Sequence, residues 1–82
     1  MSRYTKKIKG PNGNECDLAW GFDETFGYWY EIYNENEEEP IEDKSSIGGL
    51  HGTCDRGEFL EILVEYDCPK EHKKMVALDY PF

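Results

Sequence analysis

Four residues of this chain have the types and spacing of metal ligands. His51 and Cys54 resemble one zinc-binding pair, and Cys68 and His72 resemble a second. The intervening segment 55–67 has the pattern of one continuous helix, which would hold the two sulfur atoms about 20 Å apart, whereas ligands of one zinc ion lie within about 4 Å of each other. We therefore expect no metal site and no cofactor, and we keep a small zinc-binding protein as an alternative.

A cysteine nucleophile is the second chemistry that these residues could perform. Cys54 lies just before the expected helix, where the helix dipole can lower the pKa of a thiol, and His51 or His72 could serve as the base. No sequence feature fixes their mutual placement or supplies donors for an oxyanion. We therefore expect a protein that is not an enzyme, with a Cys-dependent protein as an alternative. The odd number of cysteines argues against a disulfide framework.

The glycine-rich segment 48–52 resembles a phosphate-binding loop only in composition. It lacks the Lys-Ser/Thr pair that completes such a loop. We interpret it as a connector between two parts of the chain, with Ile47 and Leu50 packing into the core.

The first half of the chain has the alternation typical of half-buried strands. Residues 15–22 place apolar side chains at every second position, and a short loop with Gly27 separates them from a second aromatic-rich run, as in a β-hairpin. In that second run, Tyr28, Tyr30 and Ile32 share one side, while Trp29, Glu31 and Tyr33 share the other. Strands are predicted at residues 3–9, 15–22, 28–33 and 40–43.

The second half has the signals of helices. Asp55 and Glu58 can form a capping box, and the apolar spacing then predicts a helix over residues 55–67. Pro69 suits the first position of a second helix, to about Ala77. The first helix is expected to bury Phe59, Ile62, Leu63 and Tyr66, with Leu60 and Val64 widening the stripe. The second should present His72, Met75 and Val76, followed by an extended tail that packs Leu78, Tyr80 and Phe82.

Strands followed by helices predict an α+β fold. We expect a three- to four-stranded antiparallel β-meander followed by two helices packed on one face. The 82 residues should form a single small domain, 1–82. Within it we expect the meander at 1–43, a Gly-rich loop at 44–52, and the helical part and extended tail at 53–82.

Charge is distributed unevenly along this chain, whose formal net charge is −9. Residues 3–9 contain four basic residues and no acid, whereas residues 15–43 contain eleven acids and no Lys or Arg. This balance argues against direct binding of nucleic acid, whose phosphates would be repelled. It is compatible with a protein partner that has a basic surface. The alternative is that the acids only keep a small protein in solution.

Hydropathy indicates no membrane association. No apolar run approaches the roughly 20 residues of a membrane span, and the N-terminus lacks the apolar core of a signal peptide. We therefore expect a cytoplasmic protein.

Several short stretches also resemble known sequences. They read W-G-F-D (20–23), G-Y-W-Y-E-I-Y (27–33), R-G-E-F-L-E-I-L-V-E-Y (56–66), C-P-K-E-H (68–72) and A-L-D-Y-P-F (77–82). Together they resemble a group of short, uncharacterised bacterial and plasmid-borne proteins, which implies a compact domain and nothing catalytic. In size and acidity the chain is also similar to phage anti-CRISPR and other anti-defence inhibitors, several of which occupy a nucleic-acid channel with carboxylates. That second similarity is one of composition.

These observations lead to one functional hypothesis. We expect a non-enzymatic acidic protein-binding module, an inhibitor of the nucleic-acid-mimic type that meets a basic nucleic-acid-binding protein. Aromatic residues beside the acidic run would anchor the interface. A structural accessory protein that forms a homodimer is a further alternative. The expected contact residues are Trp29, Glu31, Tyr33, Glu35, Glu37, Glu38, Glu39, Glu42 and Asp43.

Overall fold

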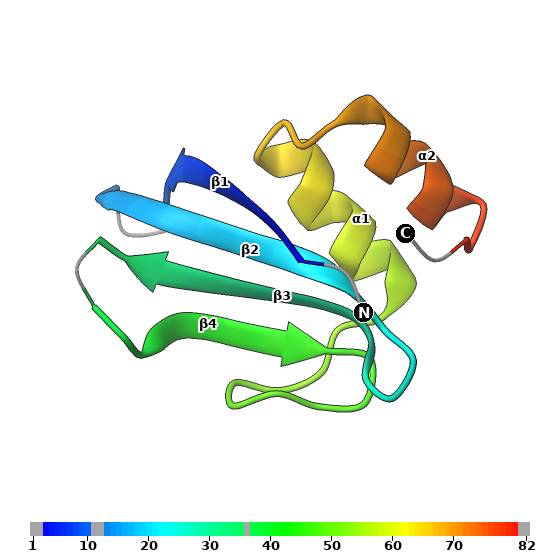
Figure 1. Ribbon diagram of the computed structural model, residues 1–82, viewed down its shortest axis with the longest axis horizontal. Helices are drawn as coiled ribbons and strands as arrows, with labels where there is room; N and C mark the ends of the chain where they lie inside the picture. Colours follow the sequence, from blue (N-terminus) through cyan, green and yellow to red (C-terminus); the bar gives the residue numbers. More distant parts are fainter. Residues whose placement is uncertain (1–2, 11–12, 36, 81–82) are drawn as a thin grey trace.

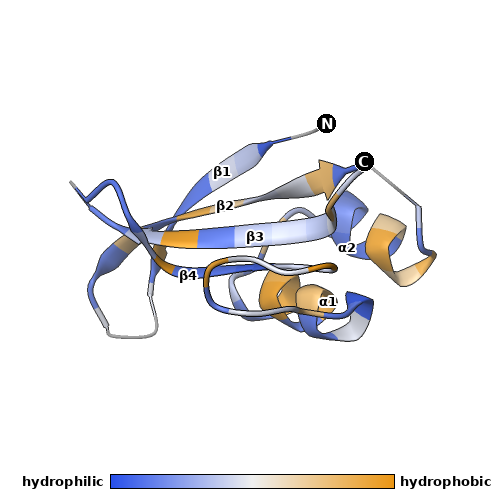
Figure 2. Ribbon diagram, turned by 90° about the horizontal axis from the view of Figure 1, so that it is seen from below, coloured by the Kyte–Doolittle hydropathy of each residue, from blue (hydrophilic) through white to orange (hydrophobic). Residues whose placement is uncertain are grey.

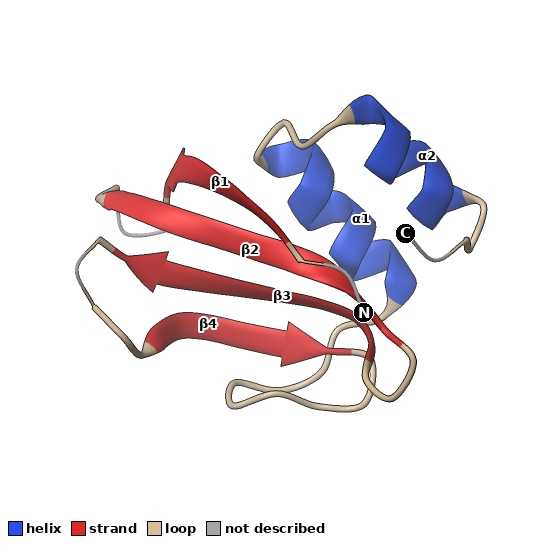
Figure 3. Cartoon of the chain, in the orientation of Figure 1, coloured by secondary structure: helices blue, strands red, loops and turns tan. Residues whose placement is uncertain are grey.

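The protein is a four-stranded antiparallel sheet followed by two helices (Figures 1 and 3). The computed structural model describes residues 3–10, 13–35 and 37–80. The strands follow one another in the order β1-β2-β3-β4, so the predicted α+β fold and meander are confirmed. The elements are β1 (Tyr4–Lys9), β2 (Glu15–Asp23), β3 (Gly27–Asn34), β4 (Pro40–Ser45), α1 (Arg56–Glu65) and α2 (Lys70–Ala77).

The strand register gives the sheet two chemically different faces. Directly opposed residues of neighbouring strands share a face, and Trp20 of β2 lies opposite Tyr30 of β3, as Leu18 lies opposite Ile32. Both helices lie on the side of these buried residues, which we call the inner face (Figure 2). The other side, which carries Trp29 of β3, is the outer face.

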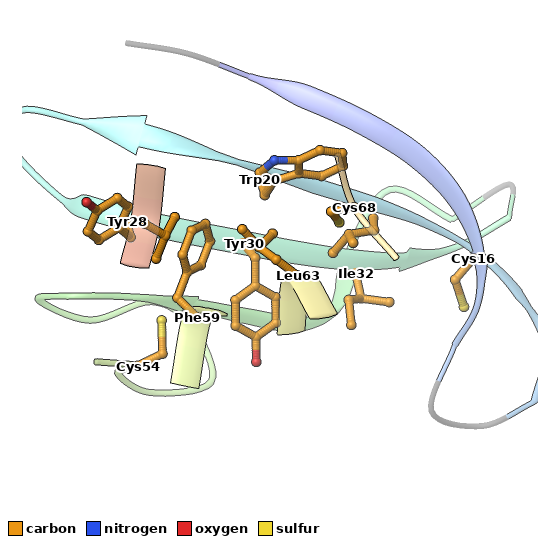
Figure 4. Close-up of a cluster of buried hydrophobic side chains, with 11 residues drawn as sticks. Cys16, Trp20, Tyr28, Tyr30, Ile32, Cys54, Phe59, Leu63 and Cys68 are labelled. Carbon is orange, nitrogen blue, oxygen red and sulfur yellow. The ribbon is translucent and has the colours of Figure 1, made fainter. Parts of the chain in front are cut away.

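The core fills the space between the inner face and the helices (Figure 4). Phe59 and Leu63 of α1 are fully buried, and the ring of Phe59 stacks on Tyr28 with centroids 5.2 Å apart. Burial of such large side chains is the main stabilising term in a small domain. The buried cluster comprises Cys16, Leu18, Trp20, Tyr28, Tyr30, Ile32, Cys54, Phe59, Leu63, Cys68 and Val76.

Each helix ends on a cation supplied by another element. The Lys6 ammonium of β1 donates to the carbonyl oxygens of Tyr66 and Asp67, both at 2.7 Å, just beyond the end of α1. The Arg56 guanidinium of α1 donates to the last carbonyls of α2, at 3.2 and 2.9 Å. Cations at these positions satisfy carbonyls that lack helical partners and complement the helix dipole. The start of α1 is the predicted capping box, with the Asp55 carboxylate accepting from the Glu58 amide at 2.8 Å.

Several packing predictions are wrong. Ile47 and Leu50 do not enter the core but are exposed on the loop, because the backbone of that loop packs along β4. Val64 faces solvent on α1. Leu78 and Tyr80 are also exposed rather than packed. The chain turns after α2, where Asp79 has a positive φ and the backbone amides of the turn donate to carbonyls of the helix. Phe82 lies outside the described residues. Strand β4 runs to Ser45, two residues further than predicted.

Within the described residues, no helix has the length and apolar character needed to cross a membrane.

Candidate protein-binding surface

The four residues with metal-ligand spacing lie apart in the fold. Cys54 precedes α1 and Cys68 follows it, so a helix of ten residues, about 15 Å long, separates the two thiols. His51 is exposed on the loop after β4. Among residues 3–10, 13–35 and 37–80, no three His, Cys, Asp or Glu side chains gather as a metal ion requires.

Burial keeps the thiols of Cys54 and Cys68 in the protonated form. All three cysteines are free and buried, at 2% exposure each. Burial raises the pKa of Cys54 to about 11, and the nearby carboxylate of Glu58 adds to this shift, so the thiol is protonated at neutral pH. Burial also raises the pKa of Cys68. The expectation that the helix dipole could lower the pKa of Cys54 is therefore wrong, because desolvation of the thiolate outweighs it.

His72 has a structural role. Its Nδ1 accepts a hydrogen bond from the indole Nε1–H of Trp20 at 3.0 Å, and its ring lies 4.3 Å from that of Tyr4. An Nδ1 acceptor requires the neutral imidazole that carries its proton on Nε2. Burial lowers the pKa of His72, which favours the same neutral form.

The outer face of the sheet is where the predicted contact residues come together. Trp29, Glu31 and Tyr33 project from β3 on this face, and Asp43 of β4 lies directly opposite Glu31. All four are half-buried. On β2 the residues opposite Glu31 and Trp29 are Ala19 and Gly21, which are small and buried, so β2 offers space beneath the larger side chains of its neighbours.

Arg3 links these side chains into one network. Its guanidinium carbon lies 5.5 Å from the centre of the Trp29 ring, a cation–π contact. Its Nη1 lies 3.1 Å from Oε1 of Glu31, and the other oxygen of Glu31 accepts from the Tyr33 hydroxyl at 2.6 Å. Desolvation and this carboxylate both raise the pKa of Tyr33. The network fixes the aromatic rings on the outer face.

A cavity of about 340 Å³ opens on this face between the sheet and two loops. We call it the Trp29 pocket. Two aromatic residues, three carboxylates and one cation line it: Phe26, Trp29, Asp23, Glu31, Asp43 and Arg3. Its remaining wall is the loop after β4, where a Cβ on Gly49 would come within 2.5 Å of the Asp43 carbonyl. Only glycine allows that approach, so the glycine-rich segment shapes the pocket.

A second hollow, of about 400 Å³, lies beside the first and shares Arg3 with it. Tyr33 and Asp17 line it together with Glu37 and Glu38 from the turn between β3 and β4. In Figures 1 and 2 this turn lies at the end of the sheet remote from the helices. The acidic turn and the outer face therefore form one continuous surface.

The remaining predicted contacts are placed differently. Glu35 and Glu39 are exposed in the same turn. Glu42 belongs to the inner face, where it accepts a hydrogen bond from the Tyr30 hydroxyl at 2.6 Å and lies 3.6 Å from the Lys44 ammonium. The nine residues thus do not form one surface, because strand alternation turns Glu42 away from its neighbour Asp43.

Part of the acidic charge is neutralised within the fold. Arg3 pairs with Glu31, and Lys7 of β1 lies 3.2 Å from Asp17 of β2. Both basic residues belong to the basic segment 3–9, which is separate in sequence from the acidic segment 15–43. Asp43 and the acids of the turn, Glu35 and Glu37 to Glu39, form no ion pair with any Lys, Arg or His among the described residues.

Arg3, Asp23 and Phe26 were not among the predicted contacts. Alternation along residues 3–9 places Arg3 and Lys7 on one side and Tyr4 and Lys6 on the other, which is a signal for an outer-face Arg3. The sequence contains no signal from which one could predict that the turn at Phe26 lies beside the loop after β4, because that placement depends on strand register.

Comparison with protein-family models, with curated proteins and with solved structures finds no match for this chain.

Proposed function

We propose that this protein is a non-enzymatic acidic module that binds a basic protein through the outer face of its sheet. The observation that carries the proposal is the outer face itself, where half-buried Trp29 and Tyr33 stand among carboxylates while both described helices cover the other face. Aromatic side chains that are held in place contribute strongly to protein interfaces. The surrounding acids select a partner of opposite charge.

The partner that fits this surface best is a nucleic-acid-binding protein. Such proteins hold phosphates with clustered Lys and Arg. Carboxylates of the acidic turn, Glu35 and Glu37 to Glu39, would replace those phosphates, and the module would act as an inhibitor by nucleic-acid mimicry. The net charge of −9 also speeds encounter with a basic surface at low ionic strength.

Affinity capture with charge-reversed variants tests this proposal. The protein is immobilised and exposed to lysate of the cells that encode it, at about 50 mM and about 500 mM salt. In one variant Glu37→Lys and Glu38→Lys reverse the acidic turn. In the matched control Glu61→Lys and Glu65→Lys reverse two exposed acids on α1. Each variant changes the net charge by the same amount, from −9 to −5, because every Glu→Lys substitution adds two positive charges.

We expect a basic nucleic-acid-binding protein, identified by mass spectrometry, to be retained at low salt and released at high salt. Reversal of the acidic turn should weaken its capture, reversal on α1 should not, and added duplex DNA or RNA should compete. Equal effects of the two variants would show that only net charge matters, and would contradict an outer-face site. Capture that is insensitive to salt would contradict the electrostatic basis.

A further inference from the structure

Arg3 lines the Trp29 pocket with a guanidinium group. Its guanidinium is held from two directions, by the Trp29 ring at 5.5 Å and by Glu31 at 3.1 Å. An aromatic face beside a carboxylate is an arrangement that binds guanidinium, through a cation–π contact and a charge-assisted hydrogen bond. The chain therefore already places one guanidinium at the edge of this pocket.

The pocket contains more negative charge than Arg3 balances. Of its three carboxylates, Glu31 is paired with Arg3, and Asp23 accepts from the turn amides of Thr25 and Phe26 at 2.7 and 3.3 Å. The third, Asp43, is half-buried and makes no hydrogen bond or ion pair through its side chain with any other described residue. A cation that enters the pocket would find this carboxylate available.

We propose that the Trp29 pocket receives an arginine side chain of the protein partner, with the guanidinium against Trp29 and Phe26 and its N–H groups directed at Asp43. This inference rests on the proposed function and names the chemistry by which the partner is recognised. Arginine fits better than lysine because its guanidinium is planar, stacks on aromatic rings, forms paired hydrogen bonds with a carboxylate and is more weakly hydrated. Nucleic-acid-binding proteins direct arginine at phosphates and guanine, so occupation of the pocket would remove such a residue from its usual ligand.

Two matched peptides test the inference. The probes are a seven-residue peptide of glycine and lysine with one arginine at its centre, and the same peptide with lysine there. Binding is followed by NMR titration at low salt through the indole N–H signal of Trp29 and the backbone amides of β3 and β4. We expect the arginine peptide to bind about fivefold more tightly, as a cation–π contact of about 1 kcal/mol implies. The indole signal of Trp20, which donates to His72, should not move.

Variants of single residues test whether the preference for the arginine peptide arises in the Trp29 pocket. Trp29→Ala should reduce the ratio of the two affinities to about 1, whereas Asp43→Asn should weaken the binding of both peptides. Glu42→Gln is the matched control, because it removes a carboxylate from the adjacent residue of β4 on the inner face, and it should keep the full ratio. An unshifted Trp20 indole signal verifies that each variant is folded.

The outcomes separate this inference from the proposed function. Equal binding of both peptides to the outer face would overturn the arginine pocket and leave the acidic module intact. A preference that persists in Trp29→Ala, or binding that Asp43→Asn leaves unchanged, would also overturn it. Failure of both peptides to bind at low salt would count against the acidic module as well.

Discussion

Replacement of Lys6 by methionine should destabilise the protein through the end of a helix far from it in sequence. Lys6 is half-buried on the inner face, and its ammonium donates to the carbonyls of Tyr66 and Asp67, both at 2.7 Å. Methionine keeps most of the apolar stem and removes the charge and the donors. The change therefore tests the cap rather than the packing of the side chain.

The expected loss of stability can be estimated from the two hydrogen bonds that Lys6 donates to these carbonyls. A hydrogen bond to a charged group contributes about 1.5–3 kcal/mol net. The Asp67 carbonyl is exposed and regains water in the variant, while the Tyr66 carbonyl is part-buried and regains less. We expect the free energy of unfolding to fall by about 1.5–2 kcal/mol, the lower end for one such bond, because the exposed Asp67 carbonyl contributes little to the loss. This corresponds to a decrease of about 6–16 °C in Tm and of about 1 M in the urea midpoint.

Urea unfolding followed by circular dichroism measures the effect, with Lys7→Met as the control. Lys7 is the next residue of β1, and its ion pair with Asp17 is exposed on the outer face. Both variants lose one positive charge, so their difference isolates the cap. Exposed ion pairs contribute little, and Lys7→Met should leave the midpoint nearly unchanged. Equal midpoints for the two variants would refute the assignment of Lys6 as the cap of α1.

Three further predictions follow from the buried polar groups. Because Cys54 and Cys68 are buried and protonated, a thiol reagent at about pH 7.5 should modify them only as fast as the chain opens, and a rapidly modified Cys54 would contradict this. Burial lowers the pKa of His72 from 6.5 in the folded protein, so as the pH falls the unfolded chain takes up this proton before the folded chain does. The contribution of His72 to stability should therefore be present above about pH 6.5 and be lost at lower pH. His72→Gln should lessen the decline of the urea midpoint between about pH 7 and about pH 5. Tyr30→Phe removes the donor to a carboxylate and should lower the free energy of unfolding by about 1–2 kcal/mol, measured in urea.

Controls for the last two come from exposed residues of the same type. His51→Gln replaces a histidine that is exposed on the loop and serves as the comparison for His72→Gln. Tyr80→Phe should leave the midpoint nearly unchanged, because Tyr80 is 60% exposed. If His72→Gln and His51→Gln behaved alike, the Trp20–His72 hydrogen bond would not govern the pH dependence.

The fold was largely predictable because its signals are local. Alternation set the faces of β2 and β3, and the capping box set the start of α1. Packing of the loop and tail was not predictable, since Ile47, Leu50 and Leu78 are apolar yet exposed. Apolar character alone does not determine burial when hydrogen bonds of the neighbouring backbone direct a short segment past the core.

The candidate surface was predictable only in part, because it depends on register. Alternation grouped Trp29, Glu31 and Tyr33 correctly. It could not place Glu42 on the inner face, because β3 and β4 shift register at Ile32 and Tyr33. A one-residue change in pairing reverses the side to which every residue of a strand points. The contacts of Arg3 with Trp29 and Glu31 likewise could not be predicted without knowing how β1 pairs with β2.

Among the described strands, β1 pairs with β2 alone. It carries Lys6, which caps α1, and it begins directly after Arg3 of the outer-face network. Fraying of this strand would release the end of α1 and loosen the wall of the Trp29 pocket in the same event. Amide exchange in the last turn of α1 should therefore report on occupancy of a surface on the opposite side of the sheet. A tag fused directly before Arg3 would disturb both together.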